Sequence, residues 1–214
     1  MSVFDSVLGL KSFRSCKDDT IPRKSMGKVL EAGRNAPSPG NVQSLEFIVV
    51  EDEHKKEFLS ESAGDHRLEE VPTAVIILGD IDRMSRRFSD HMAREACNAE
   101  AACAVQNMRL VAEEEGIGSC WIGGFDPERV SEQFGVPTGK EPLDILGFGF
   151  SLDEVERPSK FGLNEVCFYD GYGNQVGSAF DGLEWKGLHE EREIYGKKAG
   201  GFLTKLRKRA NKYL

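Results

Sequence analysis

The chain has 214 residues, 39% of them hydrophobic and 30% charged, which is typical of a globular protein with one substantial core. With 28 basic against 36 acidic residues the net charge is −8, and no run of about 18 apolar residues occurs, so we expect neither nucleic acid nor a membrane as a partner. An N-terminus without a signal-peptide layout and five cysteines with no CxxC pair predict a cytoplasmic protein.

The first elements are two helices. A short N-terminal helix can be capped by Ser2 or Asp5. A second helix is predicted over residues 20–36, opens at Pro22 and has apolar residues along one side. The segment APSPGN, residues 36–41, ends this helix because two prolines and a glycine cannot continue it.

The middle of the chain alternates strands with a long helix. Residues 45–51 read as a strand, and residues 73–80, apolar without alternation, read as a strand buried on both faces. Residues 85–115 form the longest helical pattern, whose centre is crowded with Ala and Cys. Such small residues let other helices approach closely, so we expect this helix to be packed on several sides, with a partner subunit as one possible neighbour. Residues 119–123 form a short strand.

Four elements are predicted in the remainder. Residues 126–135 form a helix with Asp126 as N-cap and a terminal glycine, and residues 142–151 form another buried strand. Residues 164–173 are expected to be extended. Residues 201–212 are expected to form a basic terminal helix that packs on a second subunit or docks to an acidic partner, unless the segment is disordered.

The stretch GIGSCWIGGFDP, residues 116–127, places four glycines among bulky apolar residues. Glycine loses the most backbone freedom on folding, so something must approach this backbone closely: a phosphate, another piece of chain or a flat aromatic cofactor. The stretch is not a GxGxxG dinucleotide fingerprint, because its glycines follow a helix instead of opening one. The chain has no HExxH motif, and its four histidines lack metal-ligand spacing, so no metal site is expected.

Three segments in series resemble the nitroreductase family of FMN-dependent NAD(P)H oxidoreductases. They are KSFRSC (residues 11–16), VLEAGRNAPSPGNVQ (residues 29–43) and the long segment from QNMRLVA to FGVP (residues 106–137), with a weaker match over residues 157–173. The resemblance implies an α+β fold, a mixed α/β sandwich around a mostly antiparallel sheet. It also implies a homodimer with two FMN molecules at the subunit interface. We expect residues 1–174 to form the FMN-binding domain and residues 175–214 a C-terminal extension.

The resemblance assigns the polar end of FMN to basic residues. Lys11 and Ser12 would meet the phosphate and ribityl oxygens, and Arg14 would approach the pyrimidine side of the ring, where a cation stabilises the reduced flavin. Leu10 stands where the family has the first of two arginines. The phosphate is therefore left to Lys11 and a later cation, for which Lys160 is the candidate.

The resemblance also assigns two segments to the flavin ring. One is a loop that would extend onto the FMN bound mainly by the other subunit, formed by Pro37, Ser38, Pro39 and Asn41. The other is the strand passing along the ring, with Trp121, Ile122, Gly123 and Gly124; the backbone N–H of Gly123 would meet flavin N5. For Trp121 packing in the core is the alternative.

The implied reaction is a ping-pong transfer from NAD(P)H to nitroaromatic or quinone acceptors, which needs no side chain as acid or base. One alternative is a specialised relative, a reductive dehalogenase or a flavin-fragmenting enzyme, with residues 61–70 and 80–92 as lid material. Another is a flavin-binding interaction protein that docks through its basic tail, residues 197–214, which carries seven Lys or Arg.

Overall fold

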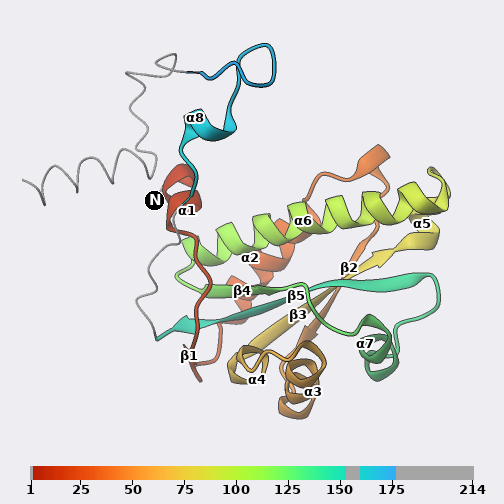
Figure 1. The fold of residues 1–214 in the computed structure, drawn as a ribbon. Coiled ribbons are helices and arrows are strands. Elements are labelled where there is room, and N and C mark those ends of the chain that lie inside the picture. Colours follow the sequence, from red (N-terminus) through yellow and green to blue (C-terminus); the bar gives the residue numbers. More distant parts are fainter. Residues whose placement is uncertain (1, 153–159, 177–214) are drawn as a thin grey trace, which may run out of the picture. The chain divides into compact units, whose positions relative to one another are not determined.

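The computed structural model describes residues 2–152 and 160–176 (Figure 1). The chain divides into two compact units, Met1–Arg157 and Pro158–Leu214, which are described here one at a time. The boundary expected at residue 174 remains a prediction. The basic terminal helix expected over residues 201–212 lies outside the described residues.

The first unit is built on an antiparallel sheet of five strands among the described residues. Strand β5 pairs with β3 along one edge, β4 along the other and β1 at its end, while β2 pairs with the outer edge of β3. The strands are β1 (Cys16–Lys17), β2 (Leu45–Val50), β3 (Thr73–Asp80), β4 (Gly118–Ile122) and β5 (Lys140–Ser151). The expected mostly antiparallel sheet is therefore confirmed.

Helices cover both faces of this sheet, as Figure 1 shows. On one face, α6 (Asp90–Glu114) lies along the strands with α2 (Arg23–Arg34) beside it. On the other lie α3 (Glu53–Ala63), α4 (Arg67–Glu70) and α7 (Pro127–Phe134). The result is the α+β sandwich that the sequence predicts.

Strand β3 shows why a run of apolar residues without alternation predicts a central strand. All eight of its residues are buried. Val75 and Ile77 belong to the core under α2 and α6, whereas Ala74 and Ile76 belong to the core under α3, α4 and α7. Because successive side chains of a strand point to opposite faces, a strand covered on both sides needs apolar residues at every position.

The short N-terminal helix α1 (Val3–Gly9) begins as predicted but leaves apolar side chains exposed. Ser2 and Asp5 form a reciprocal capping box, in which Ser2 Oγ accepts a hydrogen bond from the Asp5 N–H at 3.1 Å. Phe4 is 45% exposed and Val3 76% exposed, so within residues 2–152 the apolar face of α1 has little cover.

The long helix starts later than the sequence predicts. Residues Ile81–Ser85 form a separate helix, α5, and α6 begins at Asp90. Asp80 ends β3 and caps α5, because its carboxylate accepts a hydrogen bond from the Arg83 N–H at 2.8 Å. The expectation of one helix from residue 85 is therefore wrong.

The second unit is described over residues 160–176. Residues Leu163–Val166 form one helical turn, α8, and Phe168 pairs with Gln175 in an isolated bridge. The expectation of extended chain from residue 164 is therefore wrong for its first residues. The Glu165 carboxylate accepts a hydrogen bond from the Gly162 N–H at 2.6 Å, which favours the helical turn.

No helix within the described parts of the chain is both long enough and apolar enough to cross a membrane.

Candidate functional site

Three glycines around β4 are required by the chain's own packing. A Cβ at Gly147 would lie 2.7 Å from Sγ of Cys120, and one at Gly149 would lie 2.9 Å from Sγ of Cys16. At Gly118 it would lie 2.9 Å from Cδ1 of Phe13. These distances are too short for real side chains, so at these positions another piece of the same chain is the close neighbour.

The glycines at the far end of β4 have no such neighbour. A Cβ at Gly123 would find its nearest atom, Oδ1 of Asp144, at 3.8 Å, and one at Gly124 would find nothing within 4 Å. Gly123 borders a pocket of about 240 Å³ that α6 also lines with Arg94 and Asn98. Packing within residues 2–152 therefore does not explain these two glycines, and the backbone there is open to an incoming group.

The N-terminal segment lies beside the other end of β4. Ser12 forms an isolated parallel bridge with Ser119 of β4, so residues far apart in the sequence share one edge. Lys11 lines a pocket of about 380 Å³ together with Lys17, Glu113 and residues 116–118. The structure thus brings Lys11 and Ser12 to the glycine-rich strand, as the resemblance implies. Arg14 follows on the same segment and is exposed.

A half-buried arginine that the sequence analysis missed joins these two segments. Arg109 of α6 donates a hydrogen bond from Nη2 to Oγ of Ser12 at 3.2 Å and another from Nε to Oγ of Ser119 at 3.1 Å. Burial lowers the pKa of its guanidinium, against opposing effects of Cys120 and Glu113. The sequence feature that could have identified Arg109 is its charge within the otherwise apolar run MRLVA.

Trp121 is not a core residue among the described residues. Its indole is 40% exposed and donates a hydrogen bond from Nε1 to Oδ1 of Asp144 on the neighbouring strand at 2.6 Å. Burial raises the pKa of the Asp144 carboxyl, and the Trp121 hydrogen bond partly offsets this. The residues on either side of Trp121 in β4, Cys120 and Ile122, are buried. The structure therefore places an indole and a carboxyl group beside Gly123, and the carboxyl was not expected.

The proline-containing loop adopts a strained conformation. Pro39–Asn41 form a single 3-10 turn, and Gly40, Asn41 and Gln43 have φ values of 59°, 55° and 56°. Positive φ is costly for non-glycine residues and persists only where surrounding contacts hold it. Within the loop, Oγ of Ser38 accepts a hydrogen bond from the Gln43 N–H at 2.7 Å. Pro37 lies between the end of α2 and this turn.

One buried and one half-buried side chain, Glu100 and Arg83, hold the end of this loop. Oε2 of Glu100 on α6 accepts hydrogen bonds from the hydroxyl of Ser44 at 2.7 Å and from its N–H at 3.3 Å. Arg83 Nη1 donates to the carbonyl oxygen of Gln43 at 2.6 Å. Glu100 and Ser44 are 4% and 0% exposed, so this acid shapes the loop and does not face a ligand.

One chain does not bring this loop to Gly123. The loop leads into β2, at the edge of the sheet opposite β4, and both β3 and β5 lie between them. At about 4.8 Å per strand, β2 and β4 are about 14 Å apart. The assignment of Pro37, Ser38, Pro39 and Asn41 to the FMN of a second subunit remains a prediction, and the separation within one chain is compatible with it.

Lys160 lies in the second unit, and its assignment to the phosphate remains a prediction.

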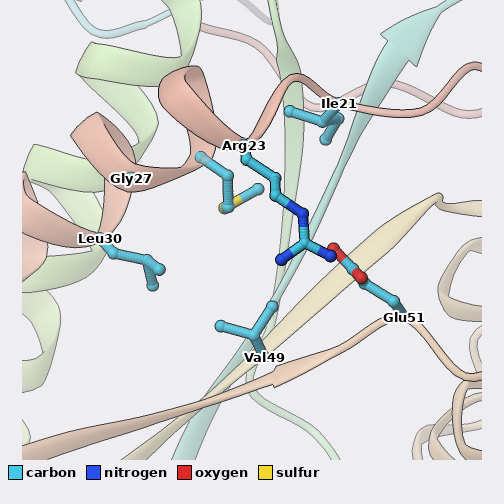
Figure 2. Close-up of a pocket in the computed structure, with 7 residues that line it drawn as sticks. Ile21, Arg23, Gly27, Leu30, Val49 and Glu51 are labelled. Atoms are coloured by element: carbon cyan, nitrogen blue, oxygen red, sulfur yellow. The ribbon is translucent and has the colours of Figure 1, made fainter.

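A further pocket of about 360 Å³ opens between α2 and β2, and none of the predicted site residues lines it. Figure 2 shows the side chains of Arg23 and Glu51 directed toward one another, with Val49 and Leu30 beside them. Among residues 2–152 and 160–176, no three His, Cys, Asp or Glu side chains gather closely enough to hold a metal ion.

Comparison with known proteins identifies the family. The model of the nitroreductase family matches residues 9–75 and 62–150. A Thermus thermophilus protein named NADH dehydrogenase is 27% identical over 192 residues, which cover 77% of this chain and 94% of that protein. A Bacillus subtilis protein named FMN reductase (NAD(P)H) is 25% identical over 187 residues, which cover 81% and 75%.

The fold comparison agrees. The structure of Bacillus megaterium NfrA1 superposes with a TM-score of 0.76 at 22% identity and covers 84% of this chain and 78% of its own. At that identity the likeness shows the fold alone. Together with the family match over residues 9–150, it establishes that this chain belongs to the nitroreductase family.

Proposed function

We propose that this protein is an FMN-dependent oxidoreductase that passes electrons from NAD(P)H to electron-poor acceptors such as nitroaromatics or quinones. The observation that carries the proposal is the open backbone at Gly123 and Gly124, which the packing of residues 2–152 leaves unexplained. The family match supports it, as does a relative named for FMN reduction with NAD(P)H.

The residues along β4 fit the chemistry of FMN. Strand β4 is about 17 Å long, with a pocket at each end. The Lys11 end has the two cations of Lys11 and Lys17 beside the carboxylate of Glu113, and the Ser12 hydroxyl lies next to Lys11 in the chain. Cations and hydroxyls suit a phosphate and a ribityl chain. The Gly123 end offers a backbone N–H without side-chain bulk beside the exposed Trp121, which suits the edge and face of a flat ring.

FMN supplies the redox chemistry when bound, because its ring accepts a hydride and returns electrons. The chain's own residues have to bind and orient. Lys11 and Ser12 would hold the phosphate end, Arg14 would hold the pyrimidine side, and the N–H of Gly123 would meet N5. Donor and acceptor would use the same open face in turn, which is a ping-pong scheme. Solvent at this open face can protonate the product.

A homodimer is part of the proposal. Val3 and Phe4 of α1 are exposed, and so are three small residues of α6, Ala99, Ala102 and Cys103. Exposed small and apolar residues on packed helices suit close contact with a second copy. Within one chain the proline-containing loop lies away from β4. In a dimer, the loop of one subunit could reach an FMN bound along β4 of the other subunit.

The test is the absorption spectrum of the purified protein. We expect flavin bands that bleach when NADPH or NADH is added without oxygen and return when a quinone is added. Sedimentation should give the mass of two chains. A colourless protein that takes up no flavin from excess FMN would contradict the proposal, and flavin that no nicotinamide reduces would contradict the choice of donor.

The structure does not favour the lid-based alternative. Residues 61–70 include α4, where Leu68 is fully buried, and residues 80–92 include α5, where Met84 is fully buried. Segments that anchor core side chains are poorly suited to opening over a substrate. The tail of the interaction-protein alternative, residues 197–214, lies outside the described residues.

A further inference from the structure

Arg109 is a half-buried cation without an anionic partner among residues 2–152 and 160–176. It donates hydrogen bonds to the hydroxyls of Ser12 and Ser119, both neutral, and it takes part in none of the ion pairs formed by the described residues. Glu113, one helical turn away, acts on it only through space. Burying a guanidinium without a counter-charge costs free energy, and a bound anion would offset that cost.

The direction of the hydrogen bonds shows how this cation would act on a ligand. A guanidinium can only donate, so Ser12 Oγ must be the acceptor in its bond with Arg109. The Ser12 hydroxyl proton is then free to point away from Arg109. A hydroxyl that accepts from a cation is polarised into a better donor. Ser12 is half-buried, so it can present this proton to a ligand, whereas Ser119 is 2% exposed.

We infer that Arg109 is a positioning residue for the phosphate of FMN: it orients and polarises the Ser12 hydroxyl as a phosphate donor. This inference rests on the proposed function. Lys11 precedes Ser12 on the same segment and is exposed, so a phosphate at the Ser12 hydroxyl would have this cation beside it in the chain. The carboxylate of Glu113 lines the same pocket as Lys11.

The test separates the phosphate from the rest of the flavin. Full-length protein freed of flavin is titrated with FMN and with riboflavin, which lacks the phosphate, and binding is followed by quenching of flavin fluorescence. For Arg109→Gln we expect FMN binding to weaken by about 10- to 100-fold, the size of a lost charged hydrogen bond. Riboflavin binding should change by less than about threefold, because the ring end of the site is untouched.

Two further variants complete the experiment. Arg129→Gln removes a positive charge from α7, on the opposite face of the sheet, and should leave both affinities unchanged. Ser12→Ala should reproduce the phosphate-selective loss, and the double variant should lose little more than either single one, because Arg109 acts through Ser12. Ser12→Ala also keeps the inference testable if Arg109→Gln does not fold.

Each other outcome is decisive. Equal loss of FMN and riboflavin, or no loss of either, would overturn the inference and make Arg109 a structural residue. Additive losses in the double variant would show that Arg109 does not act through Ser12. Wild-type protein that binds neither flavin would contradict the proposed function itself, and wild-type protein that binds riboflavin as tightly as FMN would leave the function standing and refute only the phosphate site.

Discussion

Two groups of glycines, one packed between β4 and β5 and one just after β4, look alike in sequence but differ in structure. Gly147 and Gly149, with Gly118, are glycines because Cys120, Cys16 and the neighbouring backbone leave no room for a Cβ. Gly123 and Gly124 have room for one and are glycines all the same. The first group stabilises the fold, and the second is explained by a ligand. A glycine that packing does not require is thus better evidence for a site than a glycine-rich motif.

The largest expected effect tests the packed group. Gly147→Val puts a side chain against Sγ of Cys120 at 2.7 Å and Cγ1 of Val71 at 3.0 Å, and neither neighbour can move far in this core. We expect the free energy of unfolding to fall by about 3 kcal/mol, measured by denaturant unfolding. A fall no larger than that of Gly123→Val would erase the distinction between the two groups.

The next effect tests the open group. Gly123→Val should leave the free energy of unfolding within about 0.5 kcal/mol of wild type, because no atom of the described residues opposes the new Cβ. FMN binding should weaken by about tenfold or more, since the side chain would occupy the space of the ring edge. Fluorescence titration measures this. Unchanged FMN affinity would show that the ring does not lie against Gly123.

A smaller effect is expected at Arg14 of the N-terminal segment. Arg14→Ala should weaken FMN retention by about fivefold, the size of effect expected when an exposed positive charge that contacts a ligand is removed. The control is Arg86→Ala, an exposed arginine at the end of α5 that should change nothing. Flavin retained during gel filtration at rising salt concentration is the measurement. Equal retention in wild type and Arg14→Ala would show that the N-terminal assignment is wrong at this residue.

The smallest effect concerns the acid beside Gly123. Burial raises the pKa of the Asp144 carboxyl above its ordinary value of 3.8. As the pH rises from 3.8 toward the pKa of the folded state, the unfolded chain therefore releases this proton before the folded chain does. The contribution of Asp144 to stability therefore falls across that window and then levels. Asp144→Asn lacks this loss, so its stability relative to wild type should increase with pH above 3.8, as followed by thermal unfolding. A difference independent of pH would contradict the raised pKa.

Much of the fold could be predicted because it rests on local patterns. The helix opened near Pro22, the buried strand Thr73–Asp80 and the helix between Asp126 and Gly135 all follow from residues within a few positions of one another. Helix α3 was missed although both of its caps are visible in the sequence, with Asp52 at its start and Gly64, at φ 62°, at its end. The break between α5 and α6 was missed because the helical pattern runs across it.

Less of the candidate site could be predicted. The resemblance identified the segments around Lys11 and Gly123, and the structure places both along β4. It did not identify Arg109 or Asp144, which belong to no motif and gain their interest from the residues that they contact.

The sequence by itself determined the order of the main strands and helices, the family and the presence of a glycine-rich strand, because periodicity, caps and motifs are properties of neighbouring residues. Only the tertiary structure decided which glycines are enclosed and which are open, because enclosure depends on residues such as Cys16 that lie more than a hundred positions away. It also decided that Arg109 meets Ser12 across 97 positions of sequence, since packing α6 against the sheet is what joins them. The chemistry of the site comes from these long-range contacts.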